Sequence, residues 1–174
     1  MAVEPDVVRP VPDADVSTSV TEYTEGIRAG LFGAATVALW FFILDVIQEH
    51  PLYTPTVLGT ALFRGRGALA GPGVPLTSFE LILTFTWVHC LVFVLIGIAA
   101  SKLLGVVERH PNFGFGVVLL FVLFEYAFVL AWMVLAEPVL HLLAWPAVLV
   151  GNILAAAAMA LSLWRYHPRL TIQP

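Results

Sequence analysis

The sequence predicts an all-α membrane protein in which four transmembrane helices form an up-down bundle, with a short interfacial helix in the first loop. Hydrophobic residues make up 60% of the 174 residues and charged residues only 11%, whereas soluble domains are about 45–50% apolar. Apolar runs near the ~20 residues that a spanning helix needs occur at about 26–47, 79–101, 113–136 and 146–166. We expect these spans to form one domain, residues 25–167.

The two ends of the chain are expected to be tails. Residues 1–24 are rich in proline, valine and acidic residues and supply much of the net charge of -4, a composition typical of flexible segments. Their opening lacks the basic and apolar regions of a signal peptide, and their acidity argues against a nucleic-acid partner. We therefore predict a flexible acidic cytoplasmic tail, and a short C-terminal tail at 168–174.

The first span carries small residues at every fourth position. Residues four apart share one face of a helix, and small side chains allow another helix to approach closely. The fourth span has a similar stripe. We expect the two stripes to face each other antiparallel, or the first to face a partner chain. The predicted helix-packing seam consists of Gly26, Gly30, Ala34, Ala38, Ala147, Gly151 and Ala155.

A connection of about thirty residues, rich in proline and glycine, follows the first span. Within it, Thr54 as N-cap, Pro55 at the first helical position and Gly65 beyond the end predict a short helix. Two placements are open. The helix lies either on the membrane surface with its apolar side chains in the interface, or folded over the end of the bundle.

The second span begins with a capping box from Thr77 to Glu80, in which hydroxyl and carboxylate satisfy each other's backbone amides. Its Thr86, Cys90, Gly97 and Ser101 follow helical spacing and form a small, mildly polar face, which we expect to meet other helices. His89 borders this face.

His89 and Glu125 are predicted to form a buried polar pair. Helix rise places His89 about 15 Å into the second span and Glu125 about 18 Å into the third, both near the middle of a core of about 30 Å. An unpaired carboxylate there costs roughly 2.5–3.5 kcal/mol, so a hydrogen bond to His89 is the expected solution. Two roles are open for the pair: a structural bridge between helices, or proton or quinone handling.

A second group of polar residues falls near the periplasmic ends of the spans: Asp45, Glu49, Glu80, Glu137 and His141. Carboxylate and imidazole are ligands of zinc, iron and copper. A ferritin-like centre, however, needs Glu-x-x-His pairs on two helices, whereas Glu137 and His141 are four residues apart across Pro138. We predict no metal site and no cofactor; bound lipid, quinone or pigment stays open.

Lysine and arginine predict the orientation. With four spans, both termini share one side of the membrane, and cytoplasmic loops carry the excess of positive residues. The side of the termini has Arg9, Arg28, Lys102, Arg109, Arg165 and Arg169, against Arg64 and Arg66 on the other. We therefore expect both termini in the cytoplasm, with the chain in a bacterial inner membrane.

The segment GIRAGLFGAATVALWFFILDVIQEHPLYTPTVLGTALF, residues 26–63, lies within about the first third of the chain. It resembles uncharacterised four-span membrane proteins of GC-rich bacteria. The positions that carry the resemblance are Asp45, Pro51, Leu52, Thr54, Pro55, Leu58 and Gly59. It implies the four-span fold, but no activity and no catalytic residue.

The expected role is a noncatalytic accessory or structural subunit of a larger membrane complex, such as a respiratory or photosynthetic electron-transfer assembly. Other membrane protein subunits and lipids are the expected partners. This expectation rests on elimination, because the sequence shows no nucleotide motif, paired-histidine haem site or transport repeat. The alternative is a small membrane enzyme, or a proton- or quinone-handling protein, built around His89 and Glu125.

Overall fold

The computed structural model describes residues 14–69, 78–109 and 145–166. The α-helices in these residues are α1 (Ala14–Ile47), α2 (Tyr53–Phe63), α3 (Phe79–Arg109) and α6 (Trp145–Trp164). A short 3₁₀ helix, η1 (Arg66–Leu69), follows α2. No strand occurs in the described ranges, so the predicted helical class is confirmed for that part of the chain.

Three of the helices contain segments long and apolar enough to cross a membrane: Val20–Ile47, Phe79–Glu108 and Pro146–Trp164. The first two segments contain the first and second predicted spans, and the third covers 146–164 of the fourth, which was predicted as 146–166. The third predicted span, 113–136, lies outside the described residues together with Glu125, Glu137 and His141. The structure therefore supports a helical membrane protein with three candidate spans in its described part.

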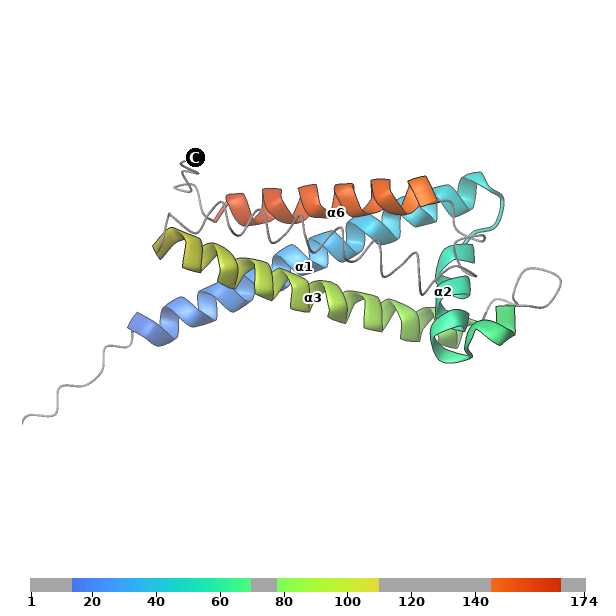
Figure 1. The fold of residues 1–174 in the computed structure, drawn as a ribbon, viewed down its shortest axis with the longest axis horizontal. Coiled ribbons are helices and arrows are strands. Elements are labelled where there is room, and N and C mark those ends of the chain that lie inside the picture. Colours follow the sequence, from blue (N-terminus) through green and yellow to red (C-terminus); the bar gives the residue numbers. More distant parts are fainter. Residues whose placement is uncertain (1–13, 70–77, 110–144, 167–174) are drawn as a thin grey trace, which may run out of the picture.

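α1 runs antiparallel to both α3 and α6 (Figure 1). α1 and α3 cross each other, and α6 lies beside the second half of α1 (Figure 1). The start of α1 thus lies at the same end as the finish of α3 and of α6, which we call the N-terminal end. α2 lies at the opposite end, which we call the α2 end (Figure 1).

Both α1 and α3 extend further toward the N-terminal end than we predicted. α1 begins at Ala14, inside the segment 1–24 that we expected to be a flexible tail, and α3 continues to Arg109, past the expected boundary at 101. The extensions contact each other, since the Lys102 ammonium donates to the Tyr23 hydroxyl at 2.7 Å. Packing between two helices thus stabilises turns whose composition alone suggested a tail and a loop.

α2 packs over the bundle end, which was one of the two placements left open. Val57 is fully buried, and the partly buried side chains around it include Phe41 of α1 and Val148 of α6. At Gly59, a methyl group would lie 2.9 Å from the Leu81 carbonyl oxygen, so α2 also touches the backbone of α3. Leu62 and Phe63 are exposed on its outer side.

Candidate functional site

The closest helix contact in the described residues is the crossing of α1 and α3. A methyl group added at Gly26 would lie 2.5 Å from the Ile98 Cα atom, and one at Gly30 would lie 2.6 Å from the Val94 Cα atom. From the other side, a methyl group at Gly97 would lie 2.6 Å from the Gly30 amide nitrogen. Each glycine thus occupies a place where even alanine would push the two backbones apart.

This arrangement differs from the expected one, in which the first stripe faced the fourth span or a partner chain. Gly26 and Gly30 contact α3, because Gly97 has no side chain to keep the two backbones apart. Ala34 is also buried, whereas Ala38 is exposed.

The stripe of the fourth span packs against larger side chains of α1. Gly151 and Ala155 are buried, and a methyl group at Gly151 would lie 3.0 Å from the Cδ1 atom of Trp40. The Trp40 indole N–H donates to the Ala147 carbonyl oxygen at 2.8 Å. The Trp40 side chain thus fills the space beside this stripe. The fourth span therefore contacts side chains of α1, and the two backbones do not cross closely there.

His89 joins α3 to α1. Its Nε2 atom lies 3.2 Å from the carbonyl oxygen of Ala34, and its ring lies between Phe85 and Phe93, with centroids 5.9 and 4.8 Å away. A carbonyl oxygen can only accept, so Nε2 carries the hydrogen and Nδ1 is the acceptor of the neutral ring. The structure thus gives His89 a bridging role between helices through a backbone atom.

Glu125, the predicted partner of His89, lies outside the described residues, so the pair stays a prediction. The hydrogen bond to Ala34 sets the form that such a pair would take. With Nε2–H engaged, a neutral ring would accept at Nδ1 from a protonated carboxyl group, and a charged ring would donate from Nδ1 to a carboxylate.

Asp45, from the predicted periplasmic group, is 2% exposed. Both of its carboxylate oxygens accept hydrogen bonds from Thr54, one from the backbone amide at 2.8 Å and one from the hydroxyl at 2.7 Å. α2 begins at Tyr53 with Leu52 at its N-cap, so Thr54 is not the cap that the sequence suggested. Asp45 caps α2 from the preceding helix, and its charge faces the positive end of the helix dipole.

The turn between α1 and α2 brings Asp45 and Thr54 together. The amide of His50 donates to the Asp45 carbonyl at 2.9 Å, and that of Glu49 donates to the Val46 carbonyl at 3.1 Å, which is the Schellman pattern of a helix end. The residue in the left-handed position is Glu49, with φ of 62°, and Leu52 has φ of 68°. Pro51, between them, prevents the helix from continuing.

The remaining members of the periplasmic group do not gather with Asp45 into a metal site within the described ranges. Glu49 and Glu80 are both exposed. Among the residues that the structure describes, no three histidine, cysteine or acidic side chains are placed to hold a metal ion.

Sequence reasoning missed a set of cation–tyrosine contacts at the N-terminal end. The Lys102 ammonium donates to the Tyr23 hydroxyl at 2.7 Å and lies 4.3 Å from the centre of its ring. The Arg28 guanidinium donates to the Tyr166 hydroxyl at 3.1 Å. The sequence marks Arg28 and Lys102 only as indicators of orientation, because their pairing with tyrosines depends on which helices are neighbours.

No family model, curated protein or solved structure matches this chain. Its class is therefore defined by the fold and composition described above: a helical protein with three candidate membrane spans in its described part.

Proposed function

We propose that the chain is a noncatalytic accessory subunit of a larger membrane protein complex. The expected setting is a respiratory or photosynthetic electron-transfer assembly in a bacterial inner membrane, with the N-terminal end of the bundle in the cytoplasm. The orientation rests on the excess of lysine and arginine on the side of the termini. The role rests on how the described spans use their polar side chains.

Several polar side chains of the described spans donate to backbone carbonyls of the chain itself, and this observation carries the proposal. Trp40, His89 and Ser101 donate to carbonyl groups of a neighbouring helix. The hydroxyls of Thr36, Thr84 and Thr86 donate to carbonyls one turn back in their own helix. The first three hydrogen bonds join neighbouring helices, as is typical of a scaffold, and the threonine hydroxyls are satisfied within their own helix.

The outer faces of the helices offer apolar contact area. Trp87 of α3 is 72% exposed, and large apolar side chains are also exposed along α1 and α6. In a bilayer, such faces pack against lipid or against helices of other subunits. They supply the surface on which an accessory subunit would join its complex.

Recovery from native membranes tests the proposal. The chain is tagged at its C-terminus, extracted in mild detergent and examined by mass spectrometry, optical spectroscopy and metal analysis. We expect a colourless, metal-free chain recovered mainly with other membrane subunits in fixed ratio. A monodisperse chain that carries a stoichiometric cofactor and turns over a substrate alone would overturn the proposal.

A second function, proton or quinone handling, is favoured by one observation. Among the described residues His89 is the only histidine inside a span, and its Nε2–H is fixed by Ala34, so that Nδ1 is oriented for a second partner. Under this alternative, Glu125→Gln keeps the fold and the assembly but abolishes quinone binding or proton transfer. Under the accessory role, the same substitution leaves complex recovery nearly unchanged.

A further inference from the structure

Two exposed cations at the N-terminal end are each held by a tyrosine from another helix. Lys102 of α3 contacts Tyr23 of α1, and Arg28 of α1 contacts Tyr166, which follows the last residue of α6. The tyrosines are about 40% exposed, at 43% and 42%. The two contacts therefore lie at the surface, where neighbouring helices meet.

The contacts lie at the ends of the candidate membrane spans. Tyr23 is near the start of the span Val20–Ile47, Lys102 is near the end of Phe79–Glu108, and Tyr166 follows the end of Pro146–Trp164. Tyrosine and basic side chains favour this level, where the ring is apolar and the polar tip reaches the headgroups. Arg28 starts deeper in its helix, and its long side chain brings the guanidinium toward the end of α6.

The geometry leaves both cations with donors to spare. Arginine has five N–H donors and lysine has three, and a tyrosine hydroxyl accepts a hydrogen bond without neutralising the charge. The tyrosine thus restricts the position of the cation and leaves other N–H groups available to an anionic oxygen. Phosphate is the matching group at this level of a membrane, since guanidinium and ammonium both bind it well.

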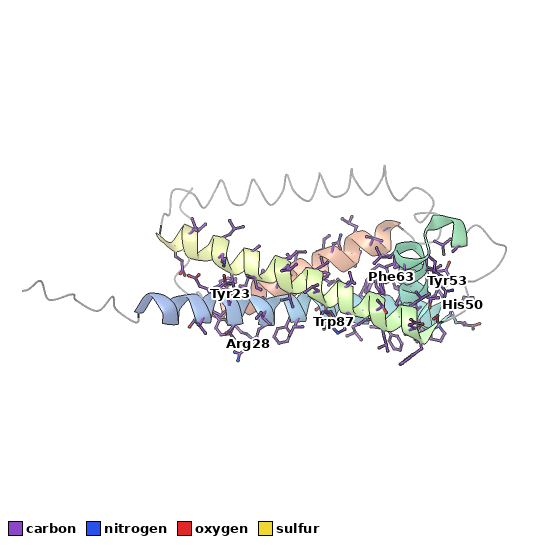
Figure 2. The ribbon with its side chains drawn as sticks, turned by 90° about the horizontal axis from the view of Figure 1, so that it is seen from below. Tyr23, Arg28, His50, Tyr53, Phe63 and Trp87 are labelled. Atoms are coloured by element: carbon purple, nitrogen blue, oxygen red, sulfur yellow. The ribbon has the colours of Figure 1, made fainter. Side chains whose placement is uncertain are left out.

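We propose that Arg28 and Lys102 bind the phosphate groups of phospholipid headgroups. The two sites lie on different sides of α1: Figure 2 shows Tyr23 between α1 and α3, and Arg28 on the side of α1 away from α3. One lipid is held where α1 meets α6 and the other where α1 meets α3. This inference requires only that the chain is in a membrane, and it does not rest on the accessory role.

Carboxylates at the N-terminal end limit which anionic groups bind there. Glu25 is 8% exposed, and a methyl group at Gly105 would lie 3.0 Å from the Glu22 Oε1 atom, so Glu22 packs against α3. Glu22, Glu25 and Glu108 all make further contacts within the protein. These negative charges distinguish the end from a polybasic patch, which attracts any anionic surface. Binding depends on individual phosphate contacts.

Native mass spectrometry of the full chain tests the proposal. The chain in mild detergent is titrated with phosphatidylglycerol, and in parallel with diacylglycerol of the same acyl chains, which lacks phosphate. We expect up to two retained phosphatidylglycerol molecules and no retained diacylglycerol. Arg28→Gln and Lys102→Gln should each weaken binding about fivefold at one site. Arg64→Gln removes an exposed arginine from the α2 end, as the matched control, and should leave binding unchanged.

Further variants separate lipid binding from folding. Tyr166→Phe and Tyr23→Phe keep each cation but remove its acceptor, so each should weaken binding less than loss of the cation does. Helical circular dichroism and a single gel-filtration peak confirm the fold of each variant. If Arg28→Gln does not fold, Tyr166→Phe tests the lipid site where α1 meets α6. The proposal is overturned if both glutamine variants bind lipid like the parent chain, or if millimolar inorganic phosphate displaces the lipid.

Discussion

Asp45 of α1 accepts two hydrogen bonds from Thr54 of α2, at 2.8 Å from the backbone amide and 2.7 Å from the hydroxyl. The residues are nine positions apart, and the carboxylate is 2% exposed. Because Leu52 at the N-cap has no side-chain acceptor, Asp45 supplies what the helix itself lacks. The contact fixes α2 across the bundle end, where Val57 and Gly59 pack against the long helices.

The first prediction follows from this contact. Asp45→Ala should destabilise the protein by about 1.5–3 kcal/mol, as expected for hydrogen bonds to a charged group, and hydrogen exchange should increase mainly in α2. Thr54→Val removes only the hydroxyl bond and should cost about 1 kcal/mol. Glu49→Gln changes an exposed carboxylate in the same turn and is the control. Unchanged exchange in α2 of the Asp45→Ala protein would contradict the capping role.

The second prediction concerns the left-handed position at Glu49, where φ is 62°. Glycine adopts this conformation without the steric cost that other residues carry. Glu49→Gly should therefore raise the free energy of unfolding by about 0.5–1 kcal/mol. Glu49→Ala also removes the carboxylate but keeps the Cβ atom, so it should give no such gain. Equal effects of both variants would assign the change to charge, not to backbone conformation.

The third prediction distinguishes the crossing of α1 and α3 from the exposed surface of α1, which other subunits could contact. Gly30→Leu should prevent α1 and α3 from crossing at their backbones, and the isolated chain should lose its compact folded state. Ala38→Leu adds similar bulk to the exposed end of the same stripe and should leave the isolated chain folded. Gel filtration and thermal unfolding in detergent compare the two variants. A stable Gly30→Leu chain would refute the crossing.

For His89, the fourth prediction uses a double-mutant cycle. His89→Phe keeps an aromatic ring between Phe85 and Phe93 but removes the hydrogen bond to Ala34. Its cost should be about 0.6 kcal/mol and no more than about 1.7, the range measured for such bonds in membranes. If His89 also pairs with Glu125, then His89→Phe and Glu125→Leu are non-additive. Strict additivity would rule the pair out.

The fifth prediction is the orientation. In a Cys90→Ala background, single cysteines at Gly67 and Gln173 should be labelled by a membrane-impermeant thiol reagent from opposite sides. Gly67 is exposed and follows α2, whereas Gln173 belongs to the predicted C-terminal tail and lies outside the described residues. In sealed bacterial cells, only the cysteine at position 67 should react. Labelling of both from outside would contradict four spans with cytoplasmic termini.

Hydrophobic run length predicted the segments 26–47, 79–101 and 146–166 well, because a span must hold enough apolar residues to cross the bilayer. The helix ends were less predictable. The helical residues beyond the predicted spans, from Ala14 in α1 and up to Arg109 in α3, are stabilised by contacts with each other, such as Lys102 with Tyr23. Turn signals did predict the short helix and Gly65 beyond its end, where φ is 79°.

The sequence gives little indication of how the candidate sites are built. Asp45 reaches Thr54 only because Glu49 and Leu52 take left-handed conformations, and neither residue type signals one. The sequence does not show that Gly30 packs against Gly97 and not against the stripe of the fourth span. Spacing identifies a face that packs closely but not the helix that packs on it. Cation–tyrosine contacts likewise depend on which helices are neighbours.

The hydrogen bond from Trp40 to Ala147 spans 107 residues of sequence. During synthesis on the ribosome, α1 emerges long before Ala147. The Trp40 indole N–H must therefore first donate its hydrogen bond to water or to lipid carbonyl groups. The bond from Thr54 to Asp45, in contrast, can form as soon as α2 has been made. The α1–α2 turn can therefore form early during synthesis, whereas α6 can pack against α1 only late.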